Sequence, residues 1–312
     1  MRRRARAASS GRSCRGWSPG HPYKRAGHRP DEGQHIRRVH TCGVDLRGAH
    51  VLLTGATGEV GRALAHSLAG RGARLTLVAR SKPDLTALTF ETGGRALPAD
   101  LLDADQRSHL VERAEELNGP LDVLVNNAGV ETSQHVADED AGSVERAVTL
   151  NLHAPIDLCR TALESMLSRD RGTIVNVSSL SAVSSVPGMA TYAATKAGLS
   201  HFTSGLQADL RGTGVRTLLV ELGPIRSPMI ERARAYPPTD AAFARLFRTR
   251  LLSIITAGRA AEAVCDALER DRRHLRLPRR AIPYALLTQA PRELAAVALT
   301  GVPHAMTRAG IR

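Results

Sequence analysis

The chain of 312 residues is predicted to fold as a single α/β domain with a doubly wound parallel sheet. Three observations predict this class. Short apolar runs of strand length alternate with helix-length segments from about Val51 to Leu277, without an obvious linker. A glycine-rich turn over residues 54–61 joins the first apolar run to the first helical segment. Hydrophobic residues make up 42% of the chain, which suffices for a core, and no uncharged apolar run reaches the ~20 residues of a membrane helix.

The positive charge is concentrated at the N-terminus. Of the net charge of +13, residues 1–46 carry +8, from eleven Lys or Arg and three acidic residues. Residues 1–45 are also rich in Gly, Ser, Pro and His, so they cannot bury enough apolar surface to offset the entropy lost on ordering. We expect a disordered basic tail over 1–45. Its arginines could contact nucleic acid or acidic lipid through charge alone, so no specific nucleic-acid partner is predicted.

Two other origins of the tail stay open. An Arg-rich, acid-poor start is typical of an organelle transit peptide, although Gly and Pro interrupt any amphipathic pattern. A start codon assigned too far upstream would give the same composition. The four cysteines form no CxxC pair, which indicates a reducing compartment, and we expect a cytoplasmic protein. No metal site is predicted, although the tail contains four histidines: His21, His28, His35 and His40.

The glycine-rich turn is typical of a dinucleotide phosphate site. It follows the short apolar strand Val51–Leu53 and precedes a helical segment over 62–68. Glycines permit a tight turn and a close approach of the backbone to a pyrophosphate, which then faces the helix N-terminus. Glu59 beside a phosphate is unfavourable unless its side chain points to solvent. The predicted contacts in this turn are Gly55, Thr57, Gly58 and Gly61.

The end of the second strand, Leu75–Val78, indicates which coenzyme is bound. An acidic residue at this place would bind the ribose 2′-hydroxyl of NAD. Ala79 occupies it here, and Arg80 and Lys82 follow. Because a guanidinium suits a 2′-phosphate, we predict NADP(H), with Arg80 as the contact. An arginine that only stacks on adenine would serve NAD equally, so NAD stays open.

Tyr192 and Lys196 are four residues apart on a predicted helix, so they share one face. A neighbouring cation favours the phenolate, and we therefore expect Lys196 to lower the pKa of Tyr192. A phenol that usually titrates at about 10 would then serve as an acid or base near neutral pH. Ser179 lies thirteen residues before Tyr192, just after the apolar run 173–177. The sequence Asn-Asn-Ala-Gly at 126–129 follows the fourth predicted strand.

In this order, the motifs resemble the short-chain dehydrogenase/reductase family over about residues 46–280. The resemblance implies one Rossmann-fold catalytic domain over 46–280, followed by a C-terminal extension over 281–312, which we expect to be partly helical. The downstream motifs match the compact, single-domain branch of the family. The glycine spacing is atypical of that branch and matches the longer, extended branch.

The resemblance implies roles for individual residues. Tyr192 would transfer the proton, Ser179 would bind the carbonyl oxygen, and Lys196 would bind the nicotinamide ribose. Asn151 would hold a helix kink and a water molecule that relays protons to Lys196. The catalytic set is therefore Asn151, Ser179, Tyr192 and Lys196. Further implied coenzyme contacts, besides Tyr192 and Lys196, are Asp100, Leu101, Asn127, Ala128, Gly129, Gly223, Ile225 and Ser227.

These observations predict an NAD(P)(H)-dependent oxidoreductase that interconverts a carbonyl and a secondary alcohol. Residues 227–256 resemble the variable substrate lid of the family. Their apolar helical face, formed by Phe243, Leu246 and Phe247, favours an apolar or lipid-like substrate. The alternatives are a catalytically idle dinucleotide-binding sensor or scaffold, nucleic-acid contact through the tail, and an epimerase or dehydratase of the same fold.

The resemblance also implies a homo-oligomer formed through the long helices that carry Asn151 and Tyr192. The extension over 281–312 could cover the active site, a second subunit or a bilayer surface, so peripheral membrane contact stays open. Simple packing onto its own domain is the favoured alternative.

Overall fold

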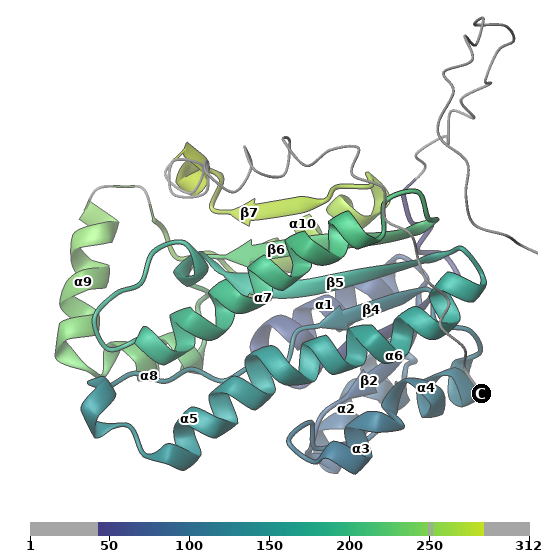
Figure 1. Cartoon of the computed structure of the whole chain (residues 1–312), viewed down its shortest axis with the longest axis horizontal. Coiled ribbons are helices and arrows are strands. Elements are labelled where there is room, and N and C mark those ends of the chain that lie inside the picture. Colours follow the sequence, from purple (N-terminus) through teal and green to yellow (C-terminus); the bar gives the residue numbers. More distant parts are fainter. Residues whose placement is uncertain (1–42, 249, 251, 284–312) are drawn as a thin grey trace, which may run out of the picture. The chain divides into compact units, whose positions relative to one another are not determined.

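The computed structural model describes residues 43–248, 250 and 252–283 and confirms the doubly wound α/β fold (Figure 1). Most of the predicted basic tail (1–45) and of the C-terminal extension (281–312) lies outside the described residues. Seven parallel strands form one sheet in the order β3-β2-β1-β4-β5-β6-β7. They are β1 (His50–Thr54), β2 (Arg74–Val78), β3 (Arg95–Ala96), β4 (Val123–Asn126), β5 (Gly172–Ser179), β6 (Val215–Leu222) and β7 (His274–Leu277). The strand order reverses between β1 and β4, where ligands of such sheets bind past the carboxyl ends.

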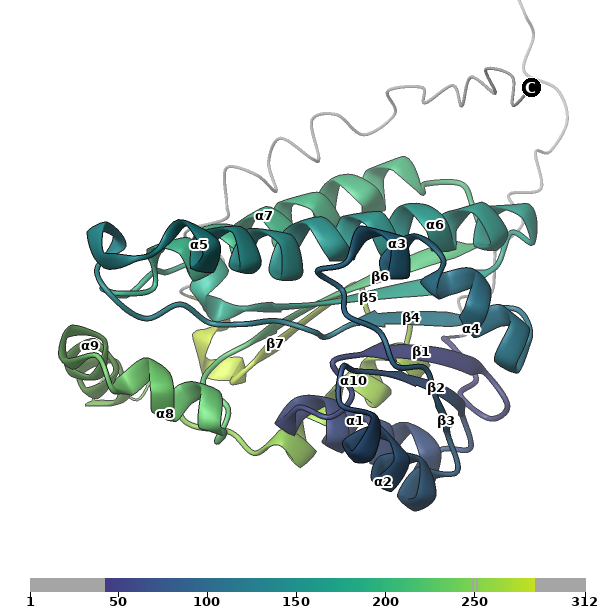
Figure 2. The same cartoon turned by 90° about the horizontal axis from the view of Figure 1, so that it is seen from below.

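Helices cover both faces of this sheet (Figure 2). One face carries α1 (Glu59–Gly70), α2 (Lys82–Thr92) and α10 (Ala257–Glu269). The opposite face carries α3 (Ala104–Ser108), α4 (Leu110–Asn118), α5 (Ala141–Val148), α6 (Ala154–Ser168) and α7 (Ala190–Asp209). A π-helical turn, Thr149–His153, joins α5 to α6.

Side chains of the central strands alternate between two hydrophobic cores. On β1, Val51 and Leu53 pack against α1 and α10, whereas Leu52 faces the core beneath α4 and α6. On β4, Val125 faces the first core and Leu124 the second. Both faces of these strands are buried, which explains why they are continuous apolar runs rather than alternating ones.

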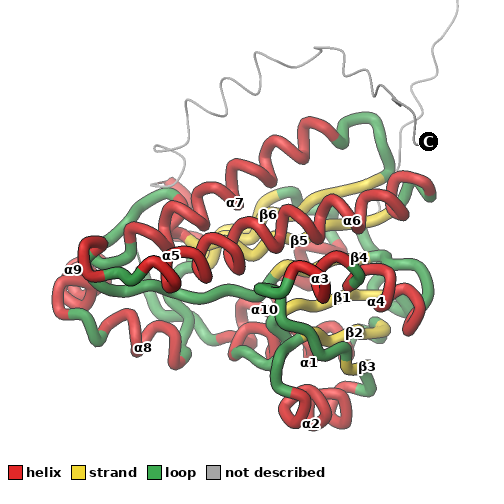
Figure 3. Tube along the Cα trace, turned by 60° about the horizontal axis from the view of Figure 1, so that its bottom comes forward, coloured by secondary structure: helices red, strands yellow, loops and turns green. Residues whose placement is uncertain are grey.

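Two further helices, α8 (Pro228–Arg234) and α9 (Pro237–Arg248), lie past the carboxyl ends of the strands (Figure 3). They coincide with the predicted substrate lid. Pro237 and Pro238 begin α9, because proline is well accepted in the first turn of a helix. Phe243 packs with Tyr192 of α7 in a small third cluster, and its ring stacks on Phe247 at 5.9 Å between centroids.

Over residues 43–283 with the gaps given above, no helix is long and apolar enough to cross a membrane. The same residues contain no group of three His, Cys, Asp or Glu side chains arranged to hold a metal ion. Cys159 and Cys265 are free and buried. Cys14, Cys42 and the four tail histidines lie outside the described residues.

Two of the three glycines in the turn are required by close packing. Gly55 has a φ of +63°, and a Cβ there would lie 2.7 Å from Ala128 Cα. A Cβ on Gly61 would lie 2.1 Å from the carbonyl oxygen of Gly55. Gly58 instead has an ordinary φ of −71°, and its Cβ would make a normal contact at 3.4 Å. The fold therefore fixes the first and last glycines of the motif and leaves the position of the middle one free, which accounts for its atypical spacing.

We expect Gly61→Ala to destabilise the protein by about 3 kcal/mol or more, because the new Cβ would overlap backbone that cannot move away. Gly70→Ala, at the other end of α1, meets nothing within 4 Å and should be neutral or stabilising by up to ~1 kcal/mol. Urea unfolding followed by circular dichroism measures both free energies. Equal stability of the two variants would contradict the packing argument.

Candidate active site

A cavity of about 710 Å³ opens at the reversal of strand order, past the carboxyl ends of the strands and bordered by α8 and α9. It gathers segments that are far apart in the sequence. Of the predicted site residues, only Asn151 does not line it. Those that do are Gly55, Thr57, Gly58, Gly61, Arg80, Asp100, Leu101, Asn127, Ala128, Gly129, Ser179, Tyr192, Lys196, Gly223, Ile225 and Ser227.

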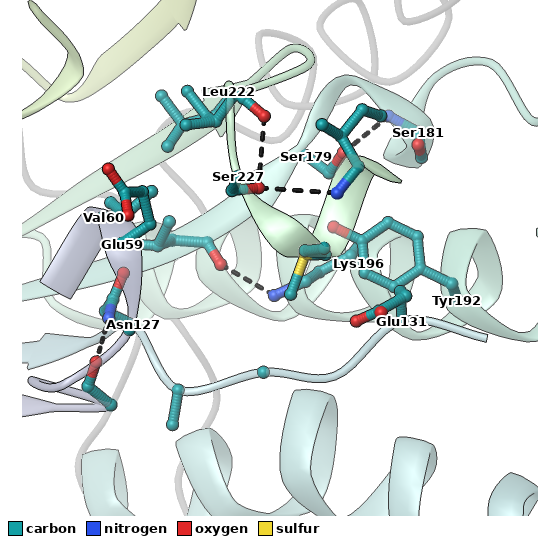
Figure 4. A pocket seen from close by; sticks show the side chains of 18 of the residues that line it. Glu59, Val60, Asn127, Glu131, Ser179, Ser181, Tyr192, Lys196, Leu222 and Ser227 are labelled. Carbon is teal, nitrogen blue, oxygen red and sulfur yellow. Dashed lines mark hydrogen bonds between the residues drawn. The ribbon is translucent and has the colours of Figure 1, made fainter. Parts of the chain in front are cut away.

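Ser179, Tyr192 and Lys196 form one buried group in the wall of this cavity (Figure 4). Ser179 ends β5, and the other two lie in the first turns of α7. Their exposed fractions are 9%, 8% and 5%. Lys196 Nζ lies 5.9 Å from the centroid of the Tyr192 ring and donates a hydrogen bond to the carbonyl oxygen of Val177 at 3.0 Å. The ammonium group is thus held between β5 and the phenol.

Burial dominates the ionisation of this group. It raises the pKa of Tyr192, an effect that the Ser179 hydroxyl opposes and the negative charge of Glu131 reinforces. Burial also lowers the pKa of Lys196 to about 8. The expectation that Lys196 lowers the pKa of Tyr192 is therefore wrong: the loss of water around the phenol outweighs its neighbours, and Lys196 is not among the groups that shift it.

Asn151 lies behind the cavity wall, in the π-helical turn between α5 and α6. Its Oδ1 accepts from Val130 N at 2.8 Å, and its Nδ2 donates to Val130 O at 2.8 Å and to Thr195 Oγ1 at 3.1 Å. The side chain is fully buried. The helix is thus irregular at Asn151, where a π-helical turn interrupts it, and the side chain joins the loop after β4 to α7.

The two adjacent serines at the end of β5 differ in their partners. Ser178 Oγ donates to the carbonyl oxygen of Lys196 at 2.9 Å and accepts from Ser200 Oγ at 2.9 Å. Ser200 Oγ also lies 3.1 Å from Glu221 Oε1, which is fully buried. The hydroxyl of Ser178 therefore positions the Lys196 backbone. Ser179 provides the hydroxyl beside Tyr192.

The ends of β1 and β4 are tied together at the floor of the cavity. Thr54 Oγ1 accepts hydrogen bonds from the backbone N–H groups of Asn127, at 3.0 Å, and Ala128, at 3.1 Å. Asn127 Nδ2 in turn donates to the carbonyl oxygens of Thr54 and Gly55, at 3.0 and 3.1 Å. The amide of Asn127 therefore braces the glycine turn. Sequence reasoning missed Thr54, whose only signal was its place before the first glycine.

Two other predicted contacts also have structural partners. Asp100 Oδ1 accepts from Leu102 N at 3.0 Å and so holds its own turn. Ser227 caps α8, and its hydroxyl accepts from Ile230 N at 3.4 Å. Both residues line the cavity, so their remaining polar atoms can face a ligand.

Two arginines, Arg62 and Arg80, line the cavity on the side of α1 and β2. Arg80 is exposed after the end of β2, and Arg62, in α1, is half-buried. Among the residues that the structure describes, neither guanidinium has an ion-pair or hydrogen-bond partner. Arg62 was not predicted; its only signal was a basic residue directly after the last glycine. Glu59, at the first position of α1, is exposed.

Glu131 is a further residue that sequence reasoning missed. It follows the Asn-Asn-Ala-Gly motif by two residues and lines the cavity beside Tyr192 (Figure 4). Its side chain is 7% exposed, and Oε1 accepts from Arg232 Nε of α8 at 2.5 Å. The other oxygen, Oε2, is buried without a hydrogen-bond partner among the described residues.

Known proteins resemble the chain over the same region. Residues 49–237 match the family described as short chain dehydrogenase. A ketoacyl reductase of Nostoc is 37% identical over 180 residues, or 56% of this chain and 63% of the Nostoc protein. The chain thus spans less than two thirds of that relative. A fatty acyl-CoA reductase of Mycobacterium tuberculosis is 35% identical over 201 residues, covering 62% of this chain and 68% of the relative.

A solved structure is similar as well. The short-chain dehydrogenase from Sphingobium yanoikuyae, in complex with NADPH, superposes with a TM-score of 0.68 and 27% identity, over 83% of this chain and 99% of that one. The family match covers more than half of the chain and includes the glycine turn, the strands β1–β6 and the Ser179–Tyr192–Lys196 group. The chain therefore belongs to the short-chain dehydrogenase/reductase family.

Proposed function

We propose that the protein is an NADP(H)-dependent reductase of ketones that carry an apolar chain. The observation that carries this proposal is the buried group of Ser179, Tyr192 and Lys196 in the wall of one cavity with the glycine turn. An acid, a hydroxyl donor and a cation are the groups that a carbonyl needs as it becomes an alcohol.

The residues at the other end of the cavity fit a dinucleotide. Gly58, at the N-cap of α1, provides no side-chain cap, so the N–H groups of the first turn are available to an anion such as a pyrophosphate. Gly55 and Gly61 keep this turn open. The guanidinium groups of Arg62 and Arg80, without partners among the residues that the structure describes, suit an additional phosphate. When bound, the coenzyme supplies or accepts the hydride.

The proton chemistry favours reduction. Because burial raises the pKa of Tyr192, its phenol stays protonated at neutral pH and can donate to a developing alkoxide. Ser179, beside it, would donate a hydrogen bond to the carbonyl oxygen. Lys196, charged below its pKa of about 8, would stabilise the phenolate left behind. Asn151 would act through position, since its hydrogen bonds hold Val130 and Thr195.

The walls of the substrate end are mainly apolar, and two relatives are named for acyl substrates, a ketoacyl reductase and a fatty acyl-CoA reductase. Both facts support a ketone on an aliphatic chain. The predicted homo-oligomer and cytoplasmic location stay predictions. The apolar side chains lining this end are Leu180, Val183, Val186, Met189, Met229, Ile230, Phe243, Leu246 and Leu252.

Arg80→Ala should weaken NADPH binding about 10- to 100-fold, the loss expected when a charge-assisted hydrogen bond is removed. NADH binding should change by less than about threefold, because NADH lacks the 2′-phosphate. Isothermal titration calorimetry measures both affinities. Lys82→Ala is the matched control, because Lys82 is exposed nearby but does not line the cavity. Equal losses for the two coenzymes would instead show that Arg80 stacks on adenine.

Tyr192→Phe should lower the rate of NADPH-dependent reduction of undecan-3-one by about 10²- to 10⁴-fold, because the proton donor is removed while the ring that packs against Phe243 is kept. The affinity for NADPH should change little. Coenzyme absorbance follows the reaction, and calorimetry follows binding. Full activity of the variant would refute Tyr192 as the acid.

The rate of reduction should fall as the pH rises through about 8, where Lys196 loses its proton. Lys196→Arg keeps its charge at these pH values, so its decline should begin at a higher pH. Unfolding caused by the deprotonation of Lys196 cannot produce this decline in rate. Its pKa is lowered in the folded state, so above pH 8 the unfolded chain binds more protons and the contribution of Lys196 to stability rises with pH. Identical pH profiles for wild type and Lys196→Arg would exclude Lys196 as the titrating group.

A further inference from the structure

The substrate end of the cavity contains one acidic side chain whose hydrogen bonding is incomplete. Glu131 is more than nine-tenths buried, and its Oε1 is bound by Arg232 of α8. Oε2 is buried and has no partner among the described residues. A buried oxygen of this kind is unfavourable, and more so when charged, unless something donates to it. Since Glu131 lines the cavity, a ligand there is the available donor.

The position of Glu131 indicates where on the ligand this donor lies. Glu131 lies next to Tyr192 in Figure 4, and its charge is felt at the phenol. Tyr192 and Ser179 would bind the reacting carbonyl oxygen. A ligand that contacts both Tyr192 and Glu131 would therefore carry its donor near that carbonyl.

The charge balance indicates the chemistry of the donor. The negative charge of Glu131 is already matched by Arg232, and the nearby Lys196 is a further cation below pH 8. A substrate ammonium group would add an unpaired positive charge to a mainly apolar cavity, which is strongly unfavourable. A neutral O–H or N–H group satisfies Oε2 without adding charge.

We propose that Glu131 is a specificity-determining residue whose Oε2 accepts a hydrogen bond from a neutral O–H or N–H group beside the reacting carbonyl. The inference rests on the proposed function and narrows its substrate class from apolar ketones to those with an adjacent donor, such as α-hydroxyketones. The Arg232 contact holds the carboxylate in place from the lid.

A matched pair of ketones tests this. In 1-hydroxydecan-2-one the donor lies beside the carbonyl, and in undecan-3-one a methyl group replaces that hydroxyl on the same octyl chain. Wild type should reduce the hydroxyketone with a kcat/KM about tenfold or more above that of undecan-3-one, the range expected for one buried hydrogen bond. In Glu131→Gln the ratio should fall severalfold, because the charged acceptor is lost: Arg232 takes the amide oxygen, and the N–H groups left facing the substrate can make only a neutral hydrogen bond to its hydroxyl.

Glu139→Gln is the matched control. Glu139 also has one buried unpartnered oxygen, and its other oxygen is bound by Thr191, but it does not line the cavity. Its variant should keep the wild-type ratio. An altered acidity of Tyr192 in Glu131→Gln affects both ketones alike and cancels in the ratio. Circular dichroism verifies that both variants are folded.

The outcomes separate this inference from the proposed function. If both ketones are reduced with equal kcat/KM, or if Glu131→Gln keeps the preference, the role of Glu131 is overturned while the reductase proposal stands. If neither ketone is reduced, the reductase proposal fails. The ratio of their Kd values, from ligand-observed NMR on wild type and the two variants, then decides the role of Glu131 by the same criterion. If neither ketone binds, both the role of Glu131 and the reductase proposal are overturned.

Discussion

The hydrogen bonds of the Thr54 hydroxyl at the reversal of strand order are the interaction on which the site depends. By accepting from the backbone of Asn127 and Ala128, Thr54 joins the end of β1 to the end of β4. This closeness leaves no room for a Cβ at Gly55, in the turn that leads to α1. The chain that leaves β4 from this point then delivers Glu131 to the substrate end. One buried hydroxyl thus joins the two strand ends from which the chain continues to both ends of the cavity.

Most of the fold follows from local sequence because the central strands are buried on both faces. Runs such as Val123–Val125 are apolar throughout, and only a sheet covered by helices on both sides accommodates them. The motif spacing and the family resemblance also singled out Tyr192, Lys196 and Ser179, and the structure brings these three residues together in the wall of one cavity. The segment predicted as a lid does form helices, and Phe243 and Phe247 recur there at helical spacing.

What sequence could not provide are quantities that depend on the surroundings in three dimensions. The direction of the Tyr192 pKa depends on how much water its phenol loses, and spacing to Lys196 says nothing of that. The sequence predicts Asn127 as a coenzyme contact. In the structure, however, its side-chain amide donates hydrogen bonds to two carbonyl oxygens of residues more than seventy positions away. The Glu131–Arg232 pair spans 101 residues, so neither side chain carries a local signal of its partner.

The charges of the cavity are divided between its two ends. Arg62 and Arg80, which have no partner in the described part of the chain, lie on the side of the glycine turn. The acidic group of the substrate end, Glu131, is paired there on one oxygen only. Lys196 lines the same cavity, and its pKa of about 8 is close enough to neutral pH for its charge to change with pH. A fully satisfied carboxylate would stabilise the lid equally well through Arg232. The incomplete hydrogen bonding of Glu131 is therefore not explained by its contact with Arg232, and its place in the cavity wall, which Glu139 lacks, points to a ligand as the missing donor.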